Sequence, residues 1–188
     1  SMAARRLAEV TLSVTTLDKG LARRLEPRAA APWRRIQTLR TLKENGIPCG
    51  VLVAPVIPGL TDSEMESILE ECVNAGARWA GFQLPRLPME VQAIFSEWLH
   101  ANEPGKANHI LNLIRDTRGG RLTDSTFGVR QRGTGPYAEM LRQRFHAACR
   151  RLGLNQEGDD LDTTQFRPPS LPGDQLGIFA DRQAGNPR

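Results

Sequence analysis

The sequence predicts an α/β fold that is built on a parallel sheet. Three strand-like runs, at residues 10–16, 49–54 and 79–84, alternate with amphipathic helical patterns. Val, Thr and Leu dominate the first run, and the second is apolar throughout, as in strands that are buried on both faces. Such alternation implies parallel strands with right-handed crossovers. The spacing fits a (β/α) barrel or an open sheet, and three strands cannot close a barrel of ordinary size.

Each expected strand is followed by a segment with helical periodicity. The first such helix begins at Pro32, a residue type favoured at the first helical position. Thr61 and Glu64 have the spacing of a capping box, so a second helix is expected there, with Gly76 at its end. Pro88 opens a third helix. The residues expected to face inward on this third helix are Val91, Ile94, Phe95, Trp98 and Leu99.

The remainder of the chain predicts two further helices with no strand between them. They span roughly 104–118 and 136–152, and a loop rich in Gly and Arg joins them. From residue 155 onward Pro, Gly, Asp and Gln accumulate, and little fixed structure is expected. The chain therefore divides into a tag scar and leader at 1–7, a βαβαβα unit at 8–103, a basic helical extension at 104–154 and a flexible tail at 155–188.

Composition excludes several classes of protein. The chain has 188 residues, of which 39% are hydrophobic and 24% charged, as in an ordinary globular protein. No apolar run reaches about 18 residues, which argues against a membrane span, and no secretory signal is evident. Cys49, Cys72 and Cys149 lie far apart. This odd, sparse set argues against a disulfide framework and predicts a cytoplasmic protein.

Positive charge is concentrated in one block of the sequence. Residues 1–104 are neutral on balance, whereas residues 105–151 hold ten basic and three acidic residues. Arginine suits phosphate contacts, so this block is a candidate nucleic-acid surface. The alternative is a codon bias towards arginine together with a solvated helix face. The arginines singled out as candidate contacts are Arg118, Arg121, Arg130 and Arg132.

Ligands of parallel βα folds bind at the carboxyl ends of the strands, where three segments offer candidates. Ser13 and Thr15 share one face of the first strand, and their hydroxyls could bind a sugar or could be satisfied internally. The second segment, residues 54–62, contains two prolines and Gly59 and predicts an irregular loop. The third places Arg86 at the mouth of the site, unless this arginine is only solvated.

Spacing alone reveals no familiar catalytic set. The sequence lacks a phosphate-binding loop, a glycine-rich dinucleotide turn and a nucleophile elbow. His100, His109 and His146 are scattered, so we expect them to be structural rather than zinc ligands. The carboxylates of Asp159, Asp160 and Asp162 lack the spacing of a calcium loop and are expected to be solvated.

The strand-end motifs, taken in order, resemble the radical S-adenosylmethionine (radical SAM) superfamily. More narrowly, they resemble its spore-photoproduct-lyase-like branch, which is also described as DNA-repair-photolyase-like. The resemblance covers about residues 8–154. It is carried by Thr11-Leu-Ser-Val-Thr-Thr-Leu-Asp18, Leu25-Glu-Pro-Arg28, Gly46-Ile-Pro48, Ala54-Pro-Val-Ile-Pro-Gly59, Ala75-Gly-Ala77, Leu87-Pro-Met-Glu-Val91 and the stretch from Phe127 to Tyr137.

This resemblance implies a partial (β/α)6 barrel that binds S-adenosylmethionine and a [4Fe–4S] cluster. In the family, reductive cleavage of S-adenosylmethionine gives a radical that abstracts hydrogen from the substrate. The three strands would correspond to strands four, five and six of that barrel. Ser13 and Thr15 match the position that contacts the ribose. Ile57 and Gly59 match the motif that packs on adenine, and Asp62 falls where that motif carries an acidic residue.

The family's cluster-binding motif, CxxxCxxC, is absent from this sequence. The three cysteines do not replace it by spacing, so no cluster and no metal site are expected on this chain alone. The resemblance therefore implies the C-terminal half of a radical SAM enzyme that is inactive by itself. Half a barrel exposes apolar surface, which predicts association with a missing half or with a second copy. The alternative is a basic nucleic-acid-binding or dimerising module without catalysis.

Overall fold

The computed structural model describes residues 2–123, 126, 130–156 and 161–166. Its strands are β1 (Val10–Val14), β2 (Cys49–Val53) and β3 (Trp79–Phe82). Its α-helices are α1 (Lys19–Leu25), α2 (Pro32–Glu44), α3 (Met65–Ala75), α4 (Met89–Asn102), α5 (Ala107–Asp116) and α6 (Gly135–Leu152), with short 3-10 turns at Ala3–Arg5 and Asp62–Glu64. In the described part of the chain, no helix is long and apolar enough to cross a membrane.

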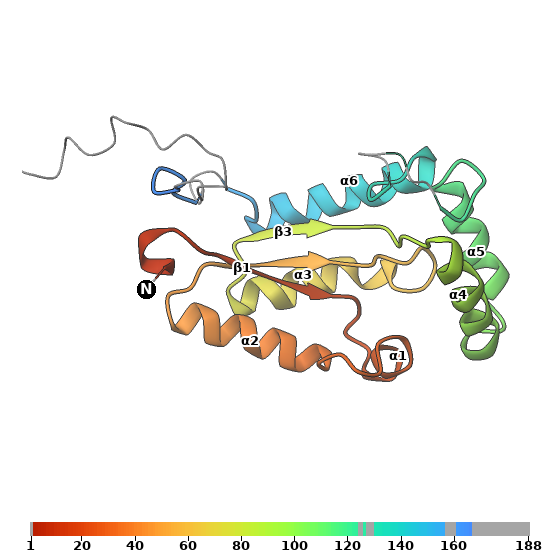
Figure 1. Ribbon diagram of the computed structural model, residues 1–188, viewed down its shortest axis with the longest axis horizontal. Helices are drawn as coiled ribbons and strands as arrows, with labels where there is room; N and C mark the ends of the chain where they lie inside the picture. The colour runs from red at the N-terminus through yellow and green to blue at the C-terminus, as the bar shows by residue number, and fades with distance from the viewer. Residues whose placement is uncertain (1, 124–125, 127–129, 157–160, 167–188) are drawn as a thin grey trace, which may run out of the picture.

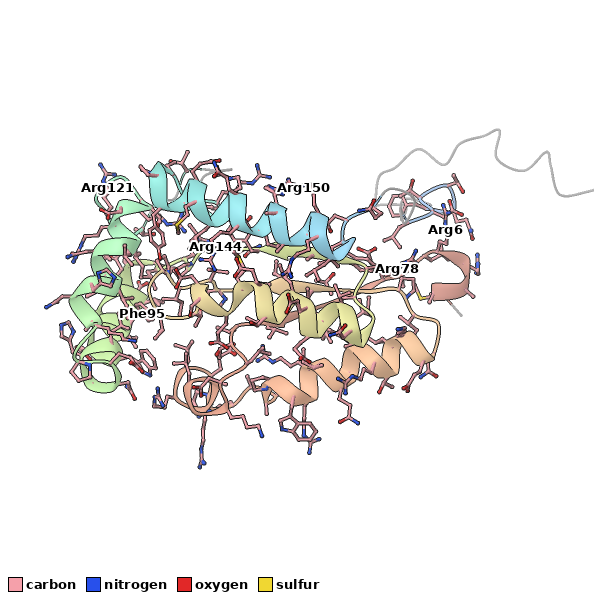
Figure 2. The ribbon with its side chains drawn as sticks, turned by 180° about the vertical axis from the view of Figure 1, so that it is seen from behind. Arg6, Arg78, Phe95, Arg121, Arg144 and Arg150 are labelled. Carbon is pink, nitrogen blue, oxygen red and sulfur yellow. The ribbon has the colours of Figure 1, made fainter. Side chains whose placement is uncertain are left out.

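The three strands form one parallel sheet in the order β1-β2-β3 within the described residues. This confirms the α/β class with a parallel sheet, while closure into part of a barrel stays a prediction. Helices α2, α3 and α6 lie behind the sheet in Figure 1 and in front of it in Figure 2. The other face of the sheet carries no helix among the described residues, and α1, α4 and α5 lie towards the carboxyl ends of the strands (Figure 1).

Burial follows the alternation of side chains along each strand. In β1, Thr11 and Ser13 are exposed on the bare face, whereas Val14 is buried towards the helices. In β2, Val51 and Val53 are buried on the helical side. The main core continues from these side chains into α2, α3 and α6 through Ile36, Leu39, Ile68, Leu69, Cys72, Leu141, Phe145 and Ala148.

The helix that covers β3 is α6 rather than α4. Phe145 of α6 is buried, and its ring centre lies 4.8 Å from that of Phe82 at the end of β3. On α4 only Leu99 is fully buried, while Val91 and Ile94 are 40% and 65% exposed. The predicted inward stripe of this helix is therefore wrong at those two positions. The physical reason is that α4 packs on α5 at the strand ends instead of lying along the sheet.

Helices α4 and α5 form a second, smaller core. Its buried residues include Leu87, Leu99, Ile110 and Ile114 from these helices and the preceding loop. Ile57, from the loop after β2, inserts into the same cluster. This contact fixes α5 over the carboxyl end of the sheet, because a buried branched side chain holds both of its neighbours in place.

The bare face of the sheet is shaped by one glycine. Gly50 of β2 pairs with Thr11 on one side and with Trp79 on the other. A Cβ atom at Gly50 would lie 2.2 Å from Nε1 of Trp79, so the indole occupies the space that a side chain would need. The indole nitrogen donates a hydrogen bond of 3.0 Å to Oγ1 of Thr11. Trp79 therefore bridges all three strands on the uncovered face.

Candidate functional site

The candidate site lies at the carboxyl ends of the three strands, where α1, α4, α5 and the loop after β2 meet. At the end of β1, Thr15 is 2% exposed. Its hydroxyl lies 3.0 Å from the carbonyl oxygen of Ala54 and 3.2 Å from Oε2 of Glu26. The Thr15 hydroxyl is thus engaged within the protein, and it joins β1 to the end of β2 and to α1.

Glu26 and Arg35 form an ion pair beside this threonine. Nη2 of Arg35 lies 3.1 Å from Oε2 of Glu26, and both side chains are mostly covered. Arg35 also donates to the carbonyl oxygens of Ser13 and Ala30 at 2.8 and 2.9 Å. This single guanidinium therefore ties the start of α2 to the end of β1. The Glu26-Pro-Arg run is part of the family resemblance, but the sequence alone assigns it no role.

The loop after β2 is held by its own side chains. The Ile57 backbone N–H donates to Oγ1 of Thr61 at 2.9 Å, and that hydroxyl lies 3.3 Å from the carbonyl oxygen of Pro55. The Gly59 N–H donates to Oδ1 of Asp62 at 2.9 Å. Gly59 has a φ of +74°, a conformation that strains residues with a side chain. The loop is therefore a fixed turn whose backbone shape depends on Thr61 and Asp62.

Asp62 also connects this loop to α6 through hydrogen bonds. The Tyr137 hydroxyl, from the first turns of α6, donates to Oδ2 of Asp62 at 2.5 Å. Burial, followed by the hydrogen bond to the Asp62 carboxylate, raises the pKa of Tyr137 to about 12. Arg144 lies between α6 and α3 (Figure 2), where it donates to the Asp62 carbonyl oxygen and pairs with Glu66 at 2.6 Å. This pairing lowers the pKa of Glu66.

The capping box predicted at Thr61 and Glu64 is absent, because both side chains have other partners. Thr61 makes no side-chain cap to the turn that follows it. The Glu64 carboxylate instead accepts from the Thr16 hydroxyl at 2.5 Å and from the Leu17 N–H at 2.7 Å. Glu64 therefore binds the chain just after β1, where backbone donors have no partner in the sheet.

The predicted cofactor-contacting residues thus fall into two groups. Ser13 is exposed on the bare face of the sheet, next to the strand ends. Thr15, Ile57 and Asp62 are buried, and Gly59 lies under α5, where an added Cβ would be 3.0 Å from Leu113. All five lie at the same edge of the sheet. Their contact with a cofactor stays a prediction.

The arginines proposed as substrate or nucleic-acid contacts do not share one environment. Arg118 is 3% exposed, and its guanidinium donates to the Pro85 carbonyl oxygen at 2.9 Å, so it does not reach the molecular surface. Arg86, Arg121 and Arg132 are exposed, and Arg130 is half-buried. Most other arginines of the 105–151 block bind neighbouring side chains: Arg115 binds Asn112, Arg142 binds Glu139, Arg144 binds Glu66 and Arg151 binds Glu70.

Parts of the predicted loop and tail lie outside the described residues. They are residues 124–125 and 127–129, which include Phe127 and Gly128 of the family-like stretch, and residues 157–160 and 167–188, which include Asp159 and Asp160 of the acidic cluster. Asp162 is described, and its carboxylate accepts hydrogen bonds from Thr164 and Gln165. These contacts, led by the hydroxyl of Thr164, lower the pKa of Asp162 to about 2.

The described residues offer no set of ligands for a metal ion or cluster, since they contain no group of three His, Cys, Asp or Glu that could hold one. The three cysteines are buried as free thiols at separate places in the core. Burial raises the pKa of all three thiols, to about 12 for Cys72 and about 11 for Cys149. Thiolates are the form that binds iron, so these residues do not suit a cluster.

We expect all three thiols to be unreactive in the folded protein at pH 8, because burial removes both access and ionisation. A chromogenic disulfide reagent should detect three thiols per chain only after denaturation. A thiol that reacts within seconds in the native protein would contradict this prediction.

Comparison with known proteins supports the resemblance at the level of the superfamily. Residues 2–72 match the Radical SAM superfamily. This radical SAM match begins before β1 and ends within α3, so it includes the Thr15, Glu26 and Gly59 contacts described above. It does not distinguish the photolyase-like branch from others.

The curated relatives are longer proteins, each described as uncharacterized. One from Mycobacterium bovis is 30% identical over 137 residues, which are 72% of this chain and 36% of that protein. One from Acidianus two-tailed virus is 32% identical over 94 residues, 47% of this chain and 27% of that protein. The chain thus spans about a third or less of the length of these relatives. No solved structure matches the chain significantly.

Proposed function

We propose that this chain is the part of a radical SAM enzyme, of the photolyase-like branch, that binds the nucleoside side of S-adenosylmethionine, and that it is inactive alone. The proposal rests on one observation, which is that the family match and a polar network fall in the same segment of the chain. The radical SAM match covers β1, α1, α2 and β2, and the strand ends of this same segment hold a pre-formed polar network.

Ser13 is the side chain that best fits a ribose. Its hydroxyl is exposed at the end of β1 and makes no hydrogen bond to another described residue, so it is free to bind a sugar hydroxyl. Thr15, Glu26 and Arg35 hold the backbone at this position, since Arg35 binds the Ser13 carbonyl oxygen. The Asp62–Gly59 contact keeps the neighbouring turn in one shape. When bound, S-adenosylmethionine supplies the radical chemistry of the family.

The iron–sulfur cluster of the family does not fit the described residues, whose three cysteines are buried at separate places, so no step is assigned to it on this chain. We infer that a further segment supplies it. The bare face of the sheet supports such a partner, and so do the outer edges of β1 and β3, which have no neighbouring strand among the described residues, because uncovered parallel sheets are rare in stable proteins. The curated relatives are long enough to contain further βα units.

The experiment that tests this function is anaerobic reconstitution with iron and sulfide, followed by reduction in the presence of S-adenosylmethionine. The isolated chain should bind little iron and release no 5′-deoxyadenosine. The intact gene product, isolated from its source cells, should have a larger mass, bind about four irons and cleave the cofactor. Cleavage by the isolated chain would overturn the claim of inactivity. An intact product of 20.8 kDa with no cluster would overturn the proposal as a whole.

A further inference from the structure

The strongest unassigned feature of this molecule is a second basic surface, on α1, α2 and the linker between them. Residues 19–43 contain eight basic residues and one acidic residue, a formal charge of +7. This excess equals that of the 105–151 block over half the length. Acidic residues elsewhere in the first hundred positions cancel this positive charge when it is summed over the whole of that region. The local excess is therefore visible only when a short segment is counted separately.

Three of the cations of this surface are free, although two of its arginines are paired. Arg24 and Arg35 are used in ion pairs with Glu103 and Glu26. Among the described residues, no hydrogen bond or ion pair engages the side chains of Lys19, Arg23 and Arg28, and all three are exposed. Unpaired, exposed cations of this density attract phosphate groups and release counterions when they bind them.

A hollow of about 210 Å³ lies within this surface. Lys19 and Arg23, one helical turn apart on α1, line it together with the small side chains of residues 29–31 and with Pro32, the first residue of α2. Glu26 also lines the hollow, but Arg35 neutralises its carboxylate. The hollow therefore combines two free cations with walls that have no competing net charge.

An exposed tryptophan follows the last residue that lines the hollow. Pro32 lines the hollow, and the next residue, Trp33, is 49% exposed on the outer face of α2. The guanidinium of Arg34 lies 4.9 Å from the centre of the indole ring. A second hollow, of about 370 Å³, runs along α2 from Trp33 and Arg34 to Thr41. An exposed aromatic ring beside free cations is the pattern that binds single-stranded nucleic acid, with bases on the ring and phosphates on the cations.

We propose that the surface formed by Lys19, Arg23, Arg28, Trp33 and Arg34 binds single-stranded nucleic acid. Phosphates are held by the three free cations on and after α1, and one base stacks on Trp33. This inference does not depend on the proposed radical SAM function, because no residue of the strand-end network takes part in it. An acidic protein partner could bind the same charges, but it has no base to stack on Trp33.

The test measures binding of a fluorescent oligothymidine by anisotropy at several salt concentrations. The variant Lys19→Gln/Arg23→Gln/Arg28→Gln should reduce the slope of log K against log salt by about 2, since each lost contact with a single strand removes about 0.7. Trp33→Ala should weaken binding about 5- to 150-fold and leave the salt slope unchanged. Thermal midpoints equal to that of the parent chain will show that these surface variants are folded.

A matched variant tests the rival surface. Arg121→Gln/Arg132→Gln/Arg150→Gln removes the same number of charges from the 105–151 block. If this variant lowers the salt slope and the α1–α2 variant does not, the proposal is overturned. It is also overturned if the parent chain fails to bind oligothymidine at about 50 mM salt, or if it binds duplex DNA or polyglutamate more tightly. These binding results do not depend on the cofactor experiment above: if the intact product failed to cleave S-adenosylmethionine, the expected binding of oligothymidine would be the same.

Discussion

Phe145→Ala is expected to lower the free energy of unfolding by about 3–5 kcal/mol, the usual cost of removing a buried aromatic side chain. Phe145 is 4% exposed and packs on Phe82, so its removal opens a cavity between α6 and the sheet. The effect is large because α6 is the helix that covers β3. Urea denaturation of the parent chain and the variant measures it directly.

The matched control is Ile94→Ala on α4. Sequence periodicity places Ile94 on the inward stripe of its helix, but the side chain is 65% exposed. Its truncation should therefore change the unfolding free energy by less than about 0.5 kcal/mol. Equal losses for the two variants would mean that α4, and not α6 alone, covers apolar surface of the sheet.

The phenol of Tyr137 is expected to titrate with a pKa of about 12 in the folded chain. Burial is the first cause, and the hydrogen bond to the Asp62 carboxylate is the second. Tyr137 is the only tyrosine of the sequence, so phenolate absorbance follows this group alone. A midpoint near the usual value of about 10 in a chain that is still folded would contradict the Asp62–Tyr137 contact.

The same shift sets the sign of a stability change at high pH. Because the folded state holds the Tyr137 proton more tightly than the unfolded state, the stabilisation is complete below about pH 10 and is lost as the pH rises towards 12. Tyr137→Phe should remove this dependence. Asp62→Asn should lower the midpoint part of the way, since it removes the carboxylate charge but not the burial.

Local pattern was sufficient to predict most of the secondary structure. The three strands begin at the predicted residues 10, 49 and 79, and each ends one or two residues earlier than expected. Helix α5 lies within the predicted range 104–118, and α6 begins one residue before the predicted range 136–152 and ends with it. The predicted helices have a strong hydrophobic periodicity and clear residues at their ends. Gly76 and Gly153, for example, have a positive φ at the ends of α3 and α6. The short helix α1 was not predicted, because seven residues give too little periodicity to detect.

The candidate site was only partly accessible to the same reasoning. Parallel strands place Ser13, Thr15 and the 54–62 loop at one edge of the sheet, and this follows from sequence alone. The partners of these residues did not follow from it. Glu64 has the spacing of a helix cap, yet it binds Thr16 and Leu17, which are 48 and 47 residues away in the sequence. A local motif cannot reveal that a distant donor competes for the same carboxylate.

By itself, then, the sequence determined the α/β class, the order of the elements and the edge of the sheet at which Ser13, Thr15 and the 54–62 loop lie, because hydrophobic period and turn residues are local properties. Tertiary structure decided which helix covers β3, which arginines remain free of partners and which groups form hydrogen bonds with Asp62. Tyr137 reaches Asp62 across 75 residues, and Arg144 reaches Glu66 across 78. Such pairings depend on which side chains the packed core brings within hydrogen-bonding distance, and only the folded chain specifies that.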